Sequence, residues 1–182
     1  MRWLAGLVFS VFALAACTAA SAHDQGPPVG AALPALEAQD QSDTTQNFDS
    51  LKGENGLVLA FVRSSDWCSY CQRQLIGLEG VRGEIEARGW RLAAVTTDIV
   101  SKNARFAARR EIGFPLLSDA DYALTQRFEL TDPAISGRHA GVPVPTILFV
   151  ASDGQVAARL GDANFRVRPA PEVVLETIDN LN

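Results

Sequence analysis

Cys68 and Cys71 are the residues whose type and spacing most directly indicate chemistry. They follow the apolar run 57–62 and open a segment with helical periodicity, so we expect them where a buried strand passes into a helix. Unpaired N–H groups and the positive end of the dipole at a helix start favour a thiolate, the reactive form of cysteine. Because the second thiol follows after one helical turn, it can close a disulfide with the first.

The order of the two cysteines predicts their roles. Cys68, at the helix start, is the candidate nucleophile, and Cys71, on the buried face one turn later, is the candidate resolving thiol. Two other readings stay open. The pair is also compatible with a purely structural disulfide, although so short a loop stabilises a fold little. It is also compatible with half of a zinc site, for which only His23 and His139 would remain as histidine ligands.

The residues beside the dithiol have candidate supporting roles. Ser65 can hydrogen-bond a thiolate or a peroxide oxygen, or serve only in a turn, and Asp66 is a candidate helix cap. Trp67 offers a flat docking surface or a core side chain, and Tyr70 is expected to shield the dithiol. His139 lies in a polar loop, where an exposed histidine is the commoner outcome.

The elements that must position these residues alternate along the chain. We expect strands over 57–62, 90–97, 114–117, 144–150 and 155–160, the last two joined by a hairpin turn at Asp153-Gly154. We expect helices that place Cys71, Leu75, Leu78, Val81 and Ile85 on one face, run from a cap at Ser101 to Ile112, run from Asp119 to Phe128, and begin at Pro171. This order predicts an α/β fold: a mixed central sheet with helices on both faces.

A CxxC pair in this setting resembles the thioredoxin fold, and Val144-Pro145-Thr146 is similar to its turn with a cis proline that faces the cysteines. Two further stretches, Val95–Asp98 and Phe114–Asp119, resemble the AhpC/TSA (peroxiredoxin) branch, as does the lead-in Leu51-Lys52-Gly53. The resemblance extends from about residue 29 to 181. It implies that Pro145 and Thr146 lie beside the dithiol.

The chain also departs from the peroxiredoxin pattern. The threonine or serine three residues before the nucleophile is present as Ser65, but Phe61 replaces the earlier proline. Thr146 stands where peroxiredoxins place an arginine, and Arg63 is a candidate substitute. The second cysteine of peroxiredoxins is usually far from the first. These departures favour thiol–disulfide exchange over peroxide reduction.

The N-terminus reads as an export signal. Arg2 precedes an apolar stretch over 3–16, which is too short to span a membrane and typical of a signal peptide. Leu14-Ala15-Ala16-Cys17 resembles a bacterial lipobox, which implies a lipidated Cys17, a tether over 17–28 and a domain over 29–182. Cleavage near Ala22 is the alternative. The expected location is the periplasmic side of a bacterial membrane, anchored by lipid, with the outer membrane open, or the soluble periplasm after cleavage near Ala22.

Composition limits the partners. The 182 residues carry a net charge of −5 without a dense cationic block, so nothing indicates nucleic-acid binding, and no motif indicates a cofactor or a metal. The leading hypothesis is an extracytoplasmic thiol–disulfide oxidoreductase that acts on protein disulfides with a thiol donor or acceptor protein. The alternatives are a thiol peroxidase, which oxidises Cys68 to a sulfenic acid, and a copper metallochaperone with His139 as third ligand.

Overall fold

The computed structural model describes residues 25–162 and 164–182. The predicted signal peptide, the lipidated Cys17 and the cleavage near Ala22 lie outside these ranges. No helix within them has the length and apolar character needed to cross a membrane.

The core of the fold is a five-stranded mixed sheet in the order β5-β4-β3-β6-β7. Its strands are β3 (Gly56–Val62), β4 (Trp90–Thr96), β5 (Leu116–Ser118), β6 (Thr146–Ala151) and β7 (Val156–Gly161). The first three run parallel, whereas β6 is antiparallel to β3 and β7 is antiparallel to β6. Every residue of β3 is buried, as expected for a central strand covered on both faces. The fold class predicted from the sequence is confirmed.

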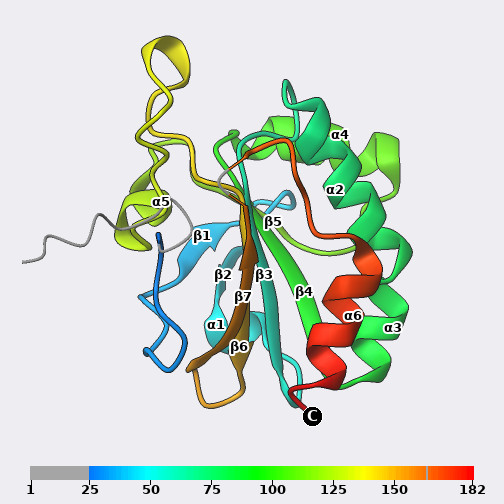
Figure 1. Cartoon of the computed structure of the whole chain (residues 1–182). Helices are drawn as coiled ribbons and strands as arrows, with labels where there is room; N and C mark the ends of the chain where they lie inside the picture. Colours follow the sequence, from blue (N-terminus) through cyan, green and yellow to red (C-terminus); the bar gives the residue numbers. More distant parts are fainter. Residues whose placement is uncertain (1–24, 163) are drawn as a thin grey trace, which may run out of the picture.

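Helices cover both faces of this sheet (Figure 1). The even-numbered β3 residues Val58, Ala60 and Val62 share one core with the helices α2 (Ser69–Gly80), α3 (Arg82–Ala87), α4 (Val100–Arg110) and α6 (Pro171–Asp179). The odd-numbered β3 residues pack on the other side with α1 (Phe48–Leu51) and α5 (Ala123–Arg127). A separate two-stranded sheet, β1 (Glu37–Gln39) with β2 (Thr45–Asn47), lies on this second side.

Local predictions for one turn and one helix start have different outcomes. The hairpin between β6 and β7 turns at Asp153-Gly154, and Gly154 has a φ of +85°, which a glycine adopts without strain. The helix expected from Asp119 begins only at Ala123, with Tyr122 as its N-cap, so Asp119 is not the cap residue; its carboxylate still accepts the backbone N–H groups of Leu124 and Thr125, at 2.7 and 2.8 Å. Burial raises the pKa of this carboxyl above its ordinary value.

Two helix predictions are wrong at particular residues. The helix expected to run through Val81 is interrupted there, and α2 and α3 meet at this half-buried residue, flanked by Gly80 and Gly83, which lower helix propensity. Ser101 does not cap α4, because the helix begins one residue earlier with Ile99 as its N-cap, without a side-chain hydrogen bond.

Candidate active site

The Cys68 sulfur is itself the cap of α2. Cys68 is the N-cap residue, with an extended backbone, and its Sγ accepts the backbone N–H of Cys71 at 3.2 Å. A cap accepts a hydrogen bond that the first helical turn would otherwise leave unmade, and here a sulfur takes the place of the usual oxygen. The same N–H group and the helix dipole stabilise negative charge on this sulfur.

The structure joins Cys68 and Cys71 by a disulfide, with their Cα atoms 5.2 Å apart. Cys71 is fully buried, whereas Cys68 keeps 6% of its surface exposed. Both cysteines are buried in this disulfide form, and the small exposed fraction belongs to Cys68. The burial order agrees with the predicted roles of nucleophile and resolving thiol.

A buried polar network fixes the turn before Cys68. The Asp98 carboxylate accepts hydrogen bonds from the Ser64 hydroxyl, at 2.9 and 3.0 Å, and from the Ser65 N–H at 2.6 Å. The Ser64 oxygen in turn accepts the N–H groups of Asp66 and Trp67, at 2.9 and 3.0 Å. Because Asp98 follows β4, this network ties the end of β3 to the end of its neighbour.

Ser65 belongs to this network rather than to the sulfurs. Its hydroxyl lies 3.0 Å from an oxygen of Asp98 and 2.9 Å from Oδ1 of Asn103, which also accepts the hydroxyl of Thr96 at 2.8 Å. All of these side chains are buried. The expectation that Ser65 bonds a thiolate or a peroxide is therefore not met in this structure, because its single proton is used within the network.

Asp66 does not cap α2 either. Its carboxylate is exposed and forms an ion pair with Lys102 of α4 at 3.0 Å, which lowers the pKa of Asp66 below its ordinary value. The Cys68 sulfur occupies the cap position instead. The charge of Asp66 is thus paired with Lys102, which limits its opposition to a thiolate on the neighbouring cysteine.

Trp67 and His139 form the exposed surface beside the dithiol. The Trp67 side chain is 42% exposed, and its ring lies 4.1 Å from the ring of His139 between centroids, at 33°. The Nε of Arg138 donates a hydrogen bond to Nε2 of His139 at 3.0 Å. This places the tip of the 129–142 loop against Trp67, which fits a docking surface better than a core side chain.

The residues implied by the thioredoxin-like turn are buried, but the cis bond is absent. No peptide bond among the described residues is cis, so the Val144–Pro145 bond is trans, the isomer that X–Pro bonds ordinarily prefer. Pro145 and Thr146 are both buried, and the Thr146 hydroxyl donates to the carbonyl of Val144 at 3.1 Å. The prediction of a cis Pro145 is wrong for this structure.

Two arginines, the buried Arg63 and the half-buried Arg168, lie near the dithiol. Arg63 directly follows β3, is 4% exposed and pairs with Asp132 at 2.7 Å. Its guanidinium carbon lies 4.0 Å from the centre of the Phe165 ring. Its Nε is buried without a hydrogen-bond partner.

Arg168 is the charged group that reaches a sulfur. Its Nη2 lies 3.8 Å from Cys71 Sγ, and its Nη1 donates to the carbonyls of Phe165 and Val167. Burial and the nearby charge of Arg63 lower the pKa of Arg168 to about 10, and its Nε is also buried without a partner. Arg168 has no carboxylate partner among the described residues, so the Cys71 sulfur is the group that can carry a compensating charge.

The sequence reading missed Asp98, Asn103 and Arg168 as parts of the site. A signal existed for Asp98, a carboxylate placed directly after a buried strand in the stretch Val95–Asp98. Arg168 had none, because it lies in an irregular segment almost one hundred residues from the dithiol. Arg63, considered as a substitute for the peroxiredoxin arginine, is buried near Arg168 but has no hydrogen bond to either sulfur.

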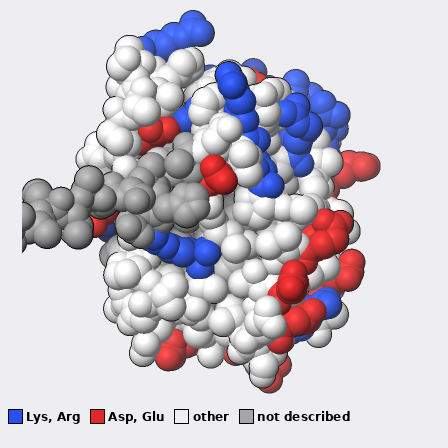
Figure 2. Space-filling model, in the orientation of Figure 1, with Lys and Arg blue, Asp and Glu red and all other residues white. Residues whose placement is uncertain are grey.

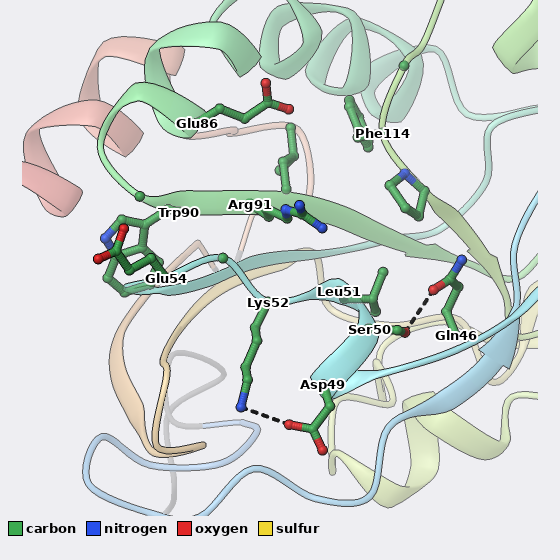
Figure 3. Close-up of a pocket in the computed structure, with 15 residues that line it drawn as sticks. Gln46, Asp49, Ser50, Leu51, Lys52, Glu54, Glu86, Trp90, Arg91 and Phe114 are labelled. Carbon is green, nitrogen blue, oxygen red and sulfur yellow. Dashed lines mark hydrogen bonds and ion pairs between the residues drawn. The ribbon is translucent and has the colours of Figure 1, made fainter.

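A hollow of about 730 Å³ lies at the end of the parallel strands away from the dithiol (Figure 3). Its lining includes Lys52 and Asp49, which pair with each other at 2.7 Å, and Gln46, whose amide oxygen accepts the Ser50 hydroxyl at 2.8 Å. No cysteine or histidine lines it, so it offers no nucleophile comparable to Cys68.

The described residues around the dithiol do not form a metal-binding cluster. Across residues 25–162 and 164–182, no three His, Cys, Asp or Glu side chains come together in a group that could hold a metal ion. His139, the third ligand considered for copper, is stacked on Trp67 and bonded to Arg138. His23 lies outside the described residues.

The mixed sheet, the dithiol at the junction of β3 and α2, and the layered helices define a thioredoxin-fold protein with a redox-capable CxxC pair. The AhpC/TSA family matches residues 29–159, which is most of the chain. The chain therefore belongs to the AhpC/TSA family. This membership and the dithiol make it a thiol-based oxidoreductase.

Relatives and solved structures agree with this assignment. The chain is 27% identical over 99 residues to Peroxiredoxin Bcp of Escherichia coli, a match that covers 54% of this chain and 62% of that protein. It is 23% identical over 163 residues to a 1-Cys peroxiredoxin of Triticum aestivum, covering 86% and 73% of the two chains.

Among solved structures, Peroxidoxin BcpB of Mycobacterium tuberculosis aligns with a TM-score of 0.72 at 20% identity, covering 85% of this chain and 97% of the other. A peroxiredoxin-like protein of Aquifex aeolicus aligns with a TM-score of 0.75 at 17% identity, covering 86% and 89%. At these identities the structural matches establish the fold.

Proposed function

We propose that this protein is an extracytoplasmic thiol–disulfide oxidoreductase, with Cys68 as nucleophile and Cys71 as resolving thiol. The observation that carries the proposal is the geometry of the pair: a sulfur that caps the helix, in a residue with 6% of its surface exposed, is bonded to the sulfur of a fully buried residue one turn into the same helix. An exchange catalyst needs this combination, because the first sulfur must meet a partner and the second must be protected from it.

In the reducing direction, the Cys68 thiolate attacks one sulfur of a partner disulfide. A Cys68–partner mixed disulfide forms, and the other partner sulfur leaves as a thiolate and takes a proton. The Cys71 thiolate then attacks Cys68 Sγ, forms the Cys68–Cys71 disulfide and releases the second partner thiolate. The partner gains two electrons, and the dithiol loses them. A thiol donor protein restores the dithiol by the reverse steps.

Different groups stabilise the thiolate form of each of the two cysteines. The Cys71 N–H and the start of α2 stabilise the charge on Cys68, whereas Arg168, with Nη2 at 3.8 Å, stabilises a thiolate on Cys71. A buried thiol without such a cation would stay protonated at neutral pH. Arg168 therefore acts as a positioning residue that keeps the resolving sulfur reactive once Cys68 is engaged.

The extracytoplasmic location rests on the sequence before residue 25. The apolar stretch 3–16 and Leu14–Cys17 support export and lipidation of Cys17, and an oxidising compartment suits a CxxC pair that cycles with protein disulfides. Expression of the full chain in a bacterial host, followed by fractionation, tests this. We expect the lipidated protein in the membrane fraction. The Cys17→Ser variant should lack the lipid, and it should therefore be either soluble or unprocessed. Recovery of the unprocessed wild-type chain in the cytosol would contradict the proposal.

The function itself is tested by reduction of a protein disulfide, with insulin as the probe. We expect the wild-type protein with a dithiol donor to reduce it faster than the donor alone, and Cys68→Ser to abolish the gain. Cys71→Ser should instead accumulate a mixed disulfide on Cys68, visible by mass. Equal rates for wild type and Cys68→Ser would refute the proposal.

The second candidate function is thiol peroxidase activity, which family membership and the peroxiredoxin relatives favour. In that reaction the Cys68 thiolate attacks a peroxide oxygen, the O–O bond breaks and an alcohol or water leaves. Cys71 then attacks the sulfenic acid, which releases water and forms the disulfide. Against this function, the Ser65 hydroxyl is used by Asp98 and Asn103, and Thr146 replaces the arginine of the peroxiredoxin pattern.

One experiment separates the two candidates. A reduced Cys71→Ser variant is mixed with one equivalent of peroxide, and sulfenic acid at Cys68 is trapped over time. Trapping at the slow rate of a free thiol favours disulfide exchange. Trapping many times faster than a free thiol would favour the peroxidase and displace our first proposal.

A further inference from the structure

A groove beside the dithiol carries positive charge without compensating carboxylates. It has a volume of about 290 Å³ and lies between α2 and the segment 166–171. Arg73, Arg166 and Arg168 line it, and none of its described lining residues is acidic. None of these three arginines forms an ion pair with a described residue. The chain as a whole carries a net charge of −5, so this grouping runs against its overall charge.

The charges on this face are separated in space. Figure 2 shows Lys and Arg gathered toward the end of the molecule where α4 lies, and Asp and Glu gathered lower, over α3 and α6. Acidic residues on α3 and α6, such as Glu84 and Asp179, pair with Arg88. The cations of the groove have no such partners among the described residues, so the local field there is positive.

Aromatic rings hold the outer two arginines in place. The Arg73 guanidinium carbon lies 4.6 Å from the centre of the Tyr70 ring, and that of Arg166 lies 5.3 Å from the centre of the Phe165 ring. The two rings meet edge to face at 6.1 Å. Stacking orients a guanidinium while it leaves the N–H donors free for a planar anion. The cations of the groove are therefore arranged before any ligand arrives.

Two polar atoms in the groove lining are buried without a partner. The side chain of Gln74 belongs to a residue only 8% exposed, and its Oε1 has no hydrogen bond. Arg168 Nε is the other. Leaving a buried donor or acceptor unpaired destabilises a fold, and both of these atoms belong to residues that line the groove. Both atoms are shielded from solvent, so the donors that a ligand in the groove can meet are the outer N–H groups of the arginines.

We propose that this groove binds the carboxylate of a small carboxylate-bearing disulfide or thiol, which it holds for reaction with the Cys68–Cys71 pair. The inference rests on the proposed function and adds a substrate class to it. The volume suits one small molecule, and Arg168 links the groove to the chemistry because its Nη2 contacts Cys71 Sγ. Arginine is the side chain best suited to a carboxylate, because its planar donors match the two oxygens.

The test compares two chromogenic disulfides of opposite character. One is 5,5′-dithiobis(2-nitrobenzoate), which carries two carboxylates, and the other is 4,4′-dithiodipyridine, which is neutral. The reduced full chain, with Cys17→Ser to remove the third thiol, is mixed with each in a stopped-flow instrument. Each reagent is reduced to two thiols while the dithiol becomes a disulfide, so absorbance reports both rates.

We expect Arg73→Gln and Arg166→Gln each to lower the ratio of the carboxylate rate to the neutral rate about tenfold, the loss of one charged hydrogen bond. Arg91→Gln makes the same change of charge on an exposed residue at the opposite end of β4 and should leave the ratio unchanged. A tricarboxylate such as citrate, at constant ionic strength, should slow only the carboxylate reagent in the wild-type protein.

The outcomes distinguish a failure of the carboxylate site from a failure of the proposed dithiol function. If the Arg73 and Arg166 variants keep the wild-type ratio, or lower it no more than Arg91→Gln does, the carboxylate site is refuted while the dithiol chemistry stands. If the wild-type protein reacts with the neutral reagent no faster than free cysteine, the proposed function itself fails. If a glutamate-rich peptide competes and citrate does not, the groove binds a protein segment, and the small-molecule proposal is overturned.

Discussion

The two flanks of the dithiol differ in how completely their polar groups are paired. On one flank, Ser64, Ser65, Asp98 and Asn103 are buried and bonded to one another. On the other flank, Arg63 and Arg168 each keep a buried Nε without a hydrogen-bond partner.

A buried network in which every donor has an acceptor has a structural role, because removing one of its side chains leaves another buried group without a partner. On the open flank, Arg63 is paired with Asp132 but Arg168 has no carboxylate partner among the described residues, so Arg168 can accommodate negative charge that appears on a sulfur during the reaction. The comparison therefore assigns stability to the Asp98 flank and reactivity to the Arg168 flank. Substitutions on the two flanks should separate these effects.

The largest expected effect is on the closed flank. Asp98→Ala leaves the Ser64 hydroxyl and the Ser65 N–H without their acceptor, and we expect the free energy of unfolding to fall by about 2–6 kcal/mol. Chemical denaturation of the oxidised protein measures this. Asp153→Ala, which removes an exposed turn carboxylate, is the matched control and should cost far less. A loss as small as that of the control would contradict the structural role of the network.

A smaller loss is expected where the open flank is anchored. Asp132→Asn keeps the size of the side chain and its bond to the Ala134 N–H but removes the counter-charge of Arg63. Losing this charged hydrogen bond should cost about 2–3 kcal/mol of unfolding free energy. Asp121→Asn changes an exposed carboxylate that accepts a similar turn N–H, and it serves as the control. Equal midpoints of denaturation for the two variants would show that the pair contributes nothing.

Arg168→Met should affect kinetics rather than stability. Removing an unpaired buried cation leaves the oxidised protein as stable as before or more so. The resolving step should slow about tenfold, or about 1.4 kcal/mol in activation free energy, because the Cys71 thiolate loses the cation beside it. Release of the second thiol from a mixed disulfide on Cys68 measures this step. Arg127→Met, an exposed arginine, is the control. Unchanged resolution in Arg168→Met would end the assignment of reactivity to this flank.

The smallest effect concerns the exposed Asp66–Lys102 pair. The ion pair lowers the pKa of Asp66 below its ordinary value of 3.8. Its stabilisation is therefore present at pH values above 3.8 and is lost as the pH falls through the lower folded value. Asp66→Asn should be slightly less stable than wild type near neutral pH and equal to it once the carboxyl is protonated. Thermal unfolding across this range checks the prediction, and a constant difference at every pH would contradict it.

The sequence predicted the strand and helix that carry the dithiol well, because both depend on interactions between residues that are close along the chain. The apolar run before Cys68 and the spacing of Cys71, Leu75 and Leu78 depend only on neighbours along the chain, and both β3 and α2 formed as expected. The predicted hairpin at Gly154 likewise depends on two adjacent residues.

The parts that were missed depend on contacts between distant segments. Arg168 reaches Cys71 from an irregular stretch with no periodicity, and Ser65 is drawn from the sulfurs by Asp98 and Asn103. The trans bond at Pro145 was missed for another reason, because the expectation was carried over from a family turn rather than from the residues here. Pairing across the fold, which decides the electrostatics of the site, leaves little trace in local patterns.

The most direct test of the account is the ionisation of each sulfur in the reduced full chain with Cys17→Ser. Iodoacetamide labelling as a function of pH, read by mass spectrometry of peptides, assigns the modification to Cys68 or Cys71. The account predicts labelling at Cys68 with a midpoint well below the value of about 8.5 for a free cysteine, and protection of the buried Cys71. Labelling first at Cys71, or at Cys68 with the midpoint and rate of a free thiol, would contradict it.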